Sequence, residues 1–424
     1  MNDNIATPFA KPLYVMLKPA GAHCNLACKY CYYLEKNHLY QNTPRHLMTD
    51  EMLEQFTREY IEAQTMPQVL FTWHGGEPLM RSIDFYKKAL ELQKKYAHGK
   101  QIDNVIQTNG TLLTDEWCEF FAQNHFLVGI SIDGPQEYHD HYRQTSAGKP
   151  SWEKVMHGIS LLKKHQVEWN AMAVVNAYNA EHPLEFYHFF RDNGCQYLQF
   201  TPIVERLTEH EDGRTLASLT DVSHEDNYED VGNAKKQKEN QEITIADFSV
   251  TPEQWGKFLC TIFDDWVRHD VGKIFVEIFD CTLANWVGVQ PGICAYSKEC
   301  GHAGVMEHNG DVFSCDHFVF PEYKLGNIQD KSLIDMLYGE KQQAFSRLKH
   351  TSLPRQCKEC AMEFACHGEC PKNRFENDKY GEPGLNYLCK GYYEYYTHVA
   401  PYMDFMKREL QAQRPPANIM NVLK

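Results

Sequence analysis

The chain has 424 residues, of which 43% are hydrophobic and 23% charged, the composition of a globular protein large enough for two domains. Its formal net charge of −15 argues against a nucleic-acid partner, whose phosphates require a basic surface. No apolar run reaches the length of a membrane span, and the N-terminus lacks the features of a signal peptide. We therefore expect a cytoplasmic protein with neither nucleic acid nor membrane as a partner.

Short apolar strands alternate with amphipathic helices up to about residue 203. The apolar spacing predicts strands at 13–17, 69–73, 104–108, 127–132, 169–175 and 197–201. Helices are predicted at 49–63, 83–96, 115–124, 152–165 and 183–192, with Thr49 and Thr114 as N-caps and Gly194 as a C-terminal cap. This alternation indicates a parallel sheet, because each parallel connection needs a crossover. Six such units without a dinucleotide-binding fingerprint favour a barrel, complete or open, with its chemistry at the carboxyl ends of the strands.

The rest of the chain divides by composition. Residues 205–247 are rich in charged and poor in apolar side chains, which is typical of a solvated linker or insertion. An amphipathic helix is predicted at 252–269, cysteines gather between 291 and 390, and the tail is aromatic and helical in pattern. The predicted domains are therefore a barrel at 1–247 that includes the 205–247 insertion, a helical connection at 248–290, a cysteine-rich module at 291–390 and a helical tail at 391–424.

A group of three cysteines follows the first predicted strand. In a reducing compartment such cysteines indicate metal or cluster ligands rather than disulfides. Cys24, Cys28 and Cys31 supply three thiolates, which leave one coordination position open, as catalytic metal sites do. A zinc site completed by His23 or by a distant ligand is the alternative for this group.

Eight further cysteines in the C-terminal third are enough for two complete quartets of ligands. They are Cys294, Cys300, Cys315, Cys357, Cys360, Cys366, Cys370 and Cys389. Zinc is again the alternative, because Cys-x2-Cys is a common zinc half-site, whereas a c-type haem is excluded because Ala361 follows Cys360. The remaining cysteines have no partner spacing and are expected in the core: Cys118, Cys195, Cys260 and Cys281. Four histidines among the ligands are expected beside them or at the surface: His302, His308, His317 and His367.

Glycine and polar residues near the ends of other strands are candidates for binding a small molecule. Gly75 and Gly76 allow backbone to approach a ligand closely, and Glu77 offers an acceptor for an ammonium group. Ser131 and Arg143 can contact a ribose or a carboxylate. The alternative for these last two is an ordinary turn and surface role.

Together, the cysteine triad, Tyr30 within it and the glycine loop resemble the radical S-adenosylmethionine superfamily. The resemblance implies a 4Fe–4S cluster on the triad whose open iron binds S-adenosylmethionine. It places these residues around that cofactor: Tyr30, Gly75, Gly76, Glu77, Ser131 and Arg143.

The C-terminal cysteines are similar to the SPASM extension of peptide-modifying radical enzymes, which carries two auxiliary 4Fe–4S clusters. The resemblance assigns four ligands to the first auxiliary cluster, Cys294, Cys300, Cys315 and Cys370. It assigns the other four to the second, Cys357, Cys360, Cys366 and Cys389. The implied fold is α/β, a partial (β/α)6 radical-SAM barrel followed by a small cysteine-rich α+β SPASM module, with three 4Fe–4S clusters in all.

Over nearly its whole length the chain resembles the anaerobic sulfatase-maturating enzymes. In that family an aspartate follows the third ligand of the first auxiliary cluster, so Asp316 is the implied general base, and Tyr33 matches a tyrosine near the substrate. His74 stands where the family has glutamine. The implied reaction uses a 5′-deoxyadenosyl radical to remove a Cβ hydrogen from a cysteine or serine of an unfolded sulfatase, which leaves Cα-formylglycine. The implied electron donor is reduced flavodoxin or a ferredoxin-type protein.

Two other functions fit parts of this pattern. A SPASM maturase would form thioether or carbon–carbon crosslinks in a ribosomal peptide. Many such enzymes carry an N-terminal recognition domain, whereas here the triad begins at Cys24, which favours sulfatase maturation. A zinc-rich scaffold without catalysis is the second alternative, and iron and sulfide analysis distinguishes it.

Overall fold

A computed structural model describes residues 12–33, 36, 39–40, 47–210, 213–216 and 243–423. These residues belong to two compact units. Unit 1 comprises Met1–Ser131, Tyr142–Trp169 and Gly301–Ser346, and unit 2 comprises Ile132–His141, Asn170–Cys300 and Arg347–Lys424. Most of the predicted 205–247 insertion, at 211–212 and 217–242, lies outside the described residues.

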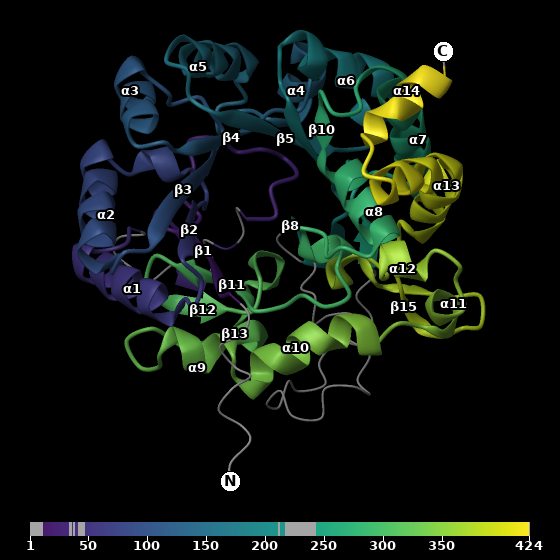
Figure 1. Ribbon diagram of the computed structural model, residues 1–424. Helices are drawn as coiled ribbons and strands as arrows, with labels where there is room; N and C mark the ends of the chain where they lie inside the picture. Colours follow the sequence, from purple (N-terminus) through teal and green to yellow (C-terminus); the bar gives the residue numbers. More distant parts are fainter. Residues whose placement is uncertain are drawn as a thin grey trace. The chain divides into compact units, whose positions relative to one another are not determined.

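Unit 1 is built on a mainly parallel sheet (Figure 1). Strands β1 (Tyr14–Lys18), β2 (Gln68–Trp73), β3 (Gln101–Thr108) and β4 (Leu127–Ser131) are neighbours in that order. On the other side of β1 lies β11 (Ala303–Glu307), parallel to it with Tyr14 opposite Ala303. Strands β12 (Asp311–Phe313) and β13 (Lys324–Asn327) continue the sheet in antiparallel fashion. The carboxyl ends of β1, β2 and β3 therefore carry the triad, the glycine loop and Asn109 at one edge.

Helices cover the β1–β4 sheet, and α1, α2 and α3 follow one another along it in Figure 1. The helices of this unit are α1 (Asp50–Ala63), α2 (Ile83–Tyr96), α3 (Asp115–Gln123), α5 (Trp152–Lys164) and α9 (Leu333–Leu337). Thr49 and Thr114 cap α1 and α3 by accepting hydrogen bonds from Met52 N and Trp117 N, as predicted. Buried aromatic rings fill the space between helices and sheet, with Phe56 and Tyr60 of α1 packed against Phe71 of β2. Short 3-10 turns lie at Pro78–Met80, Asp316–Phe318 and Pro321–Tyr323.

Unit 2 contains β5 (Trp169–Val175) and β6 (Tyr197–Pro202), which pair in parallel, and β10 (Phe275–Val276), which is parallel to β6. Its main helices are α4 (Gln136–Tyr142), α6 (Pro183–Asp192), α7 (Pro252–His269), α8 (Glu277–Val287) and α13 (Cys389–Gln411). A capping box of Thr251 and Gln254 begins α7. Helices α7 and α13 approach closely at two glycines, since a Cβ on Gly256 would lie 3.0 Å from the Gly391 Cα.

Short elements complete unit 2. They include an antiparallel sheet of β7 (Arg206–His210), β8 (Gly213–Leu216) and β9 (Ile243–Ile245), and a pair of β14 (Glu376–Asn377) and β15 (Pro383–Leu385). The short helices are α11 (Arg355–Lys358), α12 (Glu363–Cys366) and α14 (Ile419–Val422), and α10 spans Glu340–Thr351. Further 3-10 turns lie at Asn179–Glu181, Cys294–Tyr296, Pro371–Asn373 and Pro416–Asn418.

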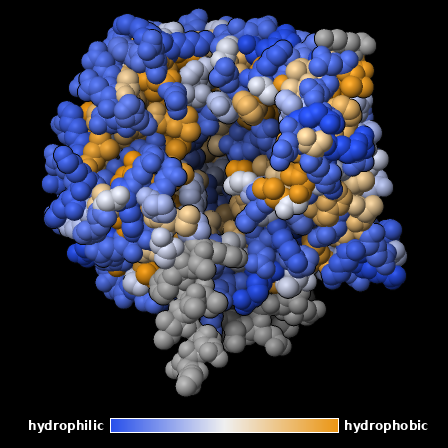
Figure 2. Space-filling view, viewed as in Figure 1, coloured by the Kyte–Doolittle hydropathy of each residue, from blue (hydrophilic) through white to orange (hydrophobic). Residues whose placement is uncertain are grey.

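All six predicted strands and all five predicted helices of the barrel pattern are present, with ends displaced by at most three residues. Helix α4 was not predicted, and neither was the pairing of β11 with β1, which brings Gly301–Ser346 into unit 1. The predicted domain boundaries remain a prediction. Hydrophilic residues make up most of the surface seen in Figure 2. Of the described helices, none is both long and apolar enough to cross a lipid bilayer.

Candidate active site

The triad loop begins where β1 ends and is held by backbone hydrogen bonds. Ala27 N donates to Gln144 O at 2.7 Å and Lys29 N donates to Tyr142 O at 3.1 Å. These bonds fix the segment that carries Cys28 and Cys31 against the chain that follows α4. Main-chain contacts thus position this part of the loop.

Cys24 is held by the end of β3. Its Sγ accepts from Leu26 N at 3.4 Å and from Asn109 Nδ2 at 3.7 Å. Asn109 Nδ2 also donates to Asn25 Oδ1 at 2.9 Å. Burial raises the pKa of the Cys24 thiol to about 11, so a bound metal is needed to keep it as a thiolate at neutral pH.

The glycine pair packs against the triad loop. Gly76 N donates to Gly21 O at 2.8 Å and Glu77 N donates to His23 O at 2.9 Å. A Cβ on Gly76 would lie 2.2 Å from His23 O, and Gly75 has φ +132°. The sequence predicts that a ligand approaches the backbone closely at these glycines. In the structure, the glycines lie close to the backbone of the triad loop.

Glu77 is buried and both of its carboxylate oxygens accept hydrogen bonds. Oε1 accepts from Leu79 N at 2.9 Å and Thr108 Oγ1 at 2.7 Å, and Oε2 accepts from Asn109 N at 2.8 Å. Burial raises the pKa of Glu77 to about 7, although these hydrogen bonds oppose the shift. Glu77 therefore ties the glycine loop to the end of β3, and its predicted contact with the cofactor remains a prediction.

The remaining predicted cofactor residues lie near the same loops. The Arg143 guanidinium is 5.5 Å from the centre of the Tyr30 ring, so the structure brings this arginine to the triad. Ser131 Oγ accepts from Gln107 Nε2 at 2.9 Å at the end of β4. Arg143 is buried, which is unlike an ordinary surface arginine.

Asp316 sits in a buried network with Lys18, the last residue of β1. Lys18 Nζ lies 2.6 Å from Asp316 Oδ1 and 2.9 Å from His74 Nδ1. Tyr32 OH donates to Asp316 Oδ2 at 2.5 Å. The Lys18 side chain is 0% exposed and that of Asp316 is 16% exposed. The carboxylate is therefore oriented from two sides by a cation and a phenol.

The charges of this network favour an ionised Asp316 and a neutral His74. Burial raises the pKa of Asp316, but the Lys18 ammonium leads the opposing interactions and the net pKa lies below its ordinary value. Burial and then the charge of Lys18 lower the pKa of His74 to about 3. An ionised carboxylate with a fixed orientation is equipped to accept a proton.

The predicted substrate residue Tyr33 lies beside this network, with Lys18 Nζ 4.1 Å from the centre of its ring, and its contact with the substrate remains a prediction. Its hydroxyl donates to Glu307 Oε1, and its ring is buried against Val305, Phe313 and Val319. The tyrosine that contacts Asp316 is its neighbour Tyr32. Neither Lys18 nor Tyr32 was predicted, although a lysine that ends an apolar strand directly before the triad was a visible signal.

The second predicted quartet lies within unit 2. Cys357 lies in α11, Cys366 ends α12 and Cys389 begins α13. Cys360 Sγ accepts from Met362 N at 3.4 Å. Gln356, which precedes Cys357, donates its Nε2 to Cys389 Sγ at 4.0 Å, so the structure brings these two distant segments together. Burial, followed by the charge of Cys389, raises the pKa of Cys357 to about 12.

Three of the four predicted ligands of the first auxiliary cluster, Cys294, Cys300 and Cys370, also lie in unit 2, whereas Cys315 lies in unit 1. All eight positions of the two quartets are cysteines, and thiolates are the ligands of iron–sulfur clusters. The donor set therefore fits such clusters. No three His, Cys, Asp or Glu side chains of the described residues are placed to hold a single metal ion.

The other cysteines and the histidines are placed mainly as predicted. Cys118, Cys195 and Cys281 are buried, and Cys260 is partly buried. The His317 ring lies 5.4 Å from that of Tyr32. His308 is buried rather than at the surface, and it fills the space that a Cβ on Gly21 would need.

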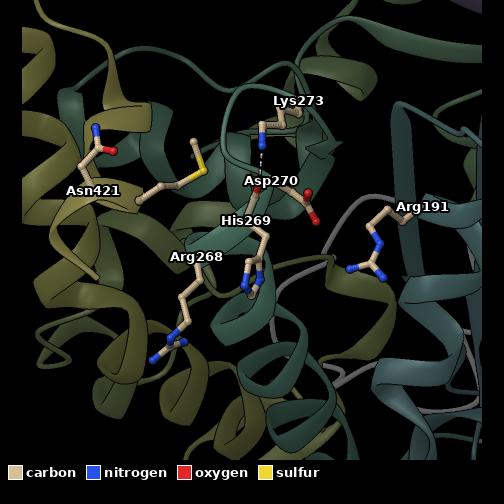
Figure 3. A pocket seen from close by; sticks show the side chains of 7 residues that line it. Arg191, Arg268, His269, Asp270, Lys273 and Asn421 are labelled. Atoms are coloured by element: carbon tan, nitrogen blue, oxygen red, sulfur yellow. Dashed lines mark hydrogen bonds between the residues drawn. The ribbon is translucent and has the colours of Figure 1, made fainter. Parts of the chain in front are cut away.

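A separate pocket of about 490 Å³ lies in unit 2 (Figure 3). It is lined by Arg191, Arg268, His269, Asp270, Lys273, Met420 and Asn421. Arg191 and His269 lie near the Asp265 carboxylate, at 3.5 Å and 3.1 Å, whereas Lys273 Nζ donates to His269 O at 2.8 Å. The pocket contains none of the predicted site residues.

Comparison with known protein families identifies two domains in the chain. Residues 19–190 match the radical SAM superfamily, and residues 299–361 match the SPASM iron–sulfur cluster-binding domain. The chain thus contains a radical SAM domain and an iron–sulfur cluster-binding domain.

A serine-type anaerobic sulfatase-maturating enzyme of Bacteroides thetaiotaomicron is 67% identical over 424 residues, which is 100% of this chain and 98% of the relative. Another of Klebsiella aerogenes is 33% identical over 401 residues, covering 93% of this chain and 87% of the relative. A solved structure of native anSMEcpe with bound AdoMet and Cp18Cys peptide matches with a TM-score of 0.78 at 28% identity, covering 94% of this chain and 100% of that one. The chain belongs to the anaerobic sulfatase-maturating enzyme family, which confirms the fold class and the resemblance found in the sequence.

Proposed function

We propose that this chain is a cytoplasmic oxidoreductase that converts a serine of an unfolded sulfatase to Cα-formylglycine. It uses S-adenosylmethionine, three 4Fe–4S clusters and electrons from reduced flavodoxin or a ferredoxin-type protein. Family membership supports the reaction, and the serine preference is supported by the 67% identity to a serine-type relative. Cysteine is the other candidate side chain, because the bound peptide named for the solved structure is Cp18Cys.

The cofactors are held by residues whose chemistry suits them. The triad of Cys24, Cys28 and Cys31 would hold the cluster that binds S-adenosylmethionine, with Tyr30 and Arg143 beside it. The two C-terminal quartets would hold the auxiliary clusters. When bound, S-adenosylmethionine on the first cluster supplies the acceptor for a Cβ hydrogen atom, and the auxiliary clusters supply an acceptor for one electron.

The observation that carries the proposal is the placement of Asp316. The serine must lose its hydroxyl proton together with the Cβ hydrogen atom and one electron, and a fixed, ionised carboxylate can take that proton. Lys18 at 2.6 Å and Tyr32 at 2.5 Å hold the two oxygens of Asp316 in place. Tyr32 and Lys18 are therefore positioning residues for the base in this proposal.

The test is anaerobic incubation of the reconstituted enzyme with two sulfatase-derived peptides that differ only in serine or cysteine at the target position. We expect the serine peptide to lose the mass of two hydrogens and to react with a hydrazide probe for aldehydes. Unmodified peptides despite cleavage of S-adenosylmethionine would contradict the proposed function. A cysteine peptide that reacts faster than the serine peptide would contradict the serine preference alone.

A further inference from the structure

Lys349 is a buried cation at one set of predicted cluster ligands. It lies near the end of α10, and its side chain is among the buried ones, with the residue 1% exposed. Its Nζ donates to the carbonyl oxygens of Cys294, Ala295 at 2.7 Å and Ser297 at 2.5 Å. No carboxylate of the described residues forms an ion pair with it, so these contacts hold the ammonium without neutralising its charge.

Arg374 is a second cation, which follows Cys370 in the chain and binds the loop that joins the two quartets. Its Nε donates to Gly368 O at 2.8 Å, and its Nη2 donates to His367 O at 2.7 Å and Glu369 O at 2.8 Å. Its Nη1 donates to the carbonyl of Lys349. The loop that it binds connects Cys366, a predicted ligand of the second auxiliary cluster, to Cys370, a predicted ligand of the first.

This loop needs an external clamp because its backbone is unusual. Three successive residues, His367, Gly368 and Glu369, have φ of +49°, +68° and +54°. Residues other than glycine rarely adopt this left-handed backbone conformation, which costs energy at His367 and Glu369. The planar guanidinium with its several donors binds all three carbonyls at once, which a lysine ammonium cannot do in the same geometry.

The two cations have different cysteines around them. Lys349 Nζ binds the backbone carbonyl of Cys294, and the thiols whose charges act most strongly on it are Cys300, Cys294 and Cys370, all assigned to the first cluster. Those that act on Arg374 are Cys366, Cys370 and Cys357, which come from both quartets. The nearby buried carboxylate is Glu369, which accepts from Asn386 Nδ2 at 2.9 Å. Arg374, like Lys349, forms no ion pair with a carboxylate of the described residues, since its donors all go to backbone carbonyls.

We propose that Lys349 and Arg374 set the reduction potentials of the auxiliary clusters, with Lys349 acting on the first cluster alone and Arg374 acting on both. The inference rests on the cofactor set of the proposed function. Reduction of a cluster adds one negative charge, and a nearby buried cation stabilises that charge more strongly than water-exposed cations do. Net charge around a cluster is one of the factors that set its potential. Both cations therefore make it easier for the auxiliary clusters to accept the electron that leaves the substrate.

The test is a redox titration of the anaerobically purified holoprotein, followed by electron paramagnetic resonance. The signal that changes on addition of S-adenosylmethionine marks the triad cluster, which leaves two auxiliary midpoints. We expect Lys349→Met to lower one of these midpoints and Arg374→Gln to lower both. Each shift should change the ratio of reduced to oxidised cluster at least tenfold, which is about 59 mV for a one-electron couple.

Charge-keeping variants and a matched control complete the experiment. Lys349→Arg keeps the charge and should retain the wild-type midpoints. Arg374→Lys keeps the charge but cannot bind the three carbonyls together, so its midpoints should fall less than those of Arg374→Gln. Lys100→Gln is the control, because Lys100 Nζ likewise donates to carbonyls, those of Ile61 at 2.5 Å and Gln64 at 2.6 Å, in unit 1. It should leave all midpoints unchanged.

The possible outcomes separate the claims. Unchanged midpoints in the neutral variants, or the same shifts in the control, would overturn the inference while leaving the proposed function intact. Loss of iron from neutral variants but not from charge-keeping ones supports it. Loss from both kinds overturns it, because the side chains would then act through their shape alone. A wild-type protein without iron–sulfur clusters would overturn the proposed function and this inference together.

Discussion

At the scale of single residues, the site is decided by charges that meet inside the protein. Asp316 is adjacent to the predicted ligand Cys315, but its orientation comes from Lys18 and Tyr32, which are nearly 300 positions earlier in the chain. An aspartate in an exposed turn would carry no such constraint. The buried ion pair is what distinguishes Asp316 from an ordinary turn residue.

The first prediction concerns Asp316→Asn. Asparagine has nearly the same shape but cannot accept the substrate proton at neutral pH, so we expect formylglycine formation to slow at least about 100-fold. The iron content and the cleavage of S-adenosylmethionine should persist, and both are measured beside product mass. Asp330→Asn, at an exposed aspartate of the same unit, is the control and should keep wild-type activity. Full activity of Asp316→Asn would remove the base assignment.

The second prediction concerns the pair of Lys18 and Asp316. Lys18→Met leaves the buried carboxylate without its cation, which should cost about 3 kcal/mol of unfolding free energy. In the double variant Lys18→Met, Asp316→Asn neither charge remains, so the loss should be smaller than the sum of the two single losses. Chemical denaturation of the wild type and the three variants measures this coupling. Strictly additive losses would show that the two side chains do not act as a pair.

The sequence predicts several residues of the site, but not the contacts between them. The spacing of cysteines is local and readable, and Asp316 was predicted because it adjoins Cys315. The partners of Asp316 could not be predicted, because β1 and the segment after β12 meet only through the pairing of β1 with β11. The same holds for Lys349 and Arg374, whose contacts depend on how the loops between cysteines fold.

At the scale of elements, local signals were sufficient for strands and helices but not for their order in the sheet. Periodicity and capping residues predicted α2, α6 and α7 with their observed bounds. Every turn of an amphipathic helix carries apolar residues on its buried face, so this signal is local. Strand β11 (Ala303–Glu307) is also mainly apolar in sequence. Strand β11 lies beside β1 although the whole predicted barrel pattern separates the two strands in the sequence. No local pattern encodes such a pairing.

The third prediction tests how two loops at the ends of β1 and β2 support the triad. Gly76→Ala would place a Cβ 2.2 Å from His23 O, and the loop before Cys24 must then move. We expect loss of the iron and of the resonance signal of the triad cluster, with the auxiliary clusters retained. Gly292→Ala, where a Cβ meets nothing within 4 Å, is the matched control. Normal triad iron in Gly76→Ala would show that the loop tolerates the displacement.

At the scale of the whole molecule, the segment that packs against the triad loop and the segment that carries the second quartet have very different cores. Residues 69–92 of unit 1 bury eight apolar side chains, namely Val69, Phe71, Trp73, Leu79, Phe85, Tyr86, Ala89 and Leu92. Residues 353–389 of unit 2 bury three, namely Leu353, Ala365 and Leu388. A segment with so little buried apolar surface needs another source of folding free energy, and bound metal is the usual one.

This difference yields the fourth prediction, in which two thiols are removed from each site. Cys357→Ala with Cys360→Ala should unfold the segment 353–389 locally, because the cluster supplies the free energy that its few apolar contacts cannot. Cys28→Ala with Cys31→Ala should leave residues 69–92 protected, since their core does not include the thiols. Amide hydrogen exchange read by mass spectrometry compares the same two segments in both variants and in the wild type. If 353–389 stayed protected after losing its iron, its fold would be maintained by the hydrogen bonds of Arg374 and its neighbours, and the clusters would serve electron transfer alone.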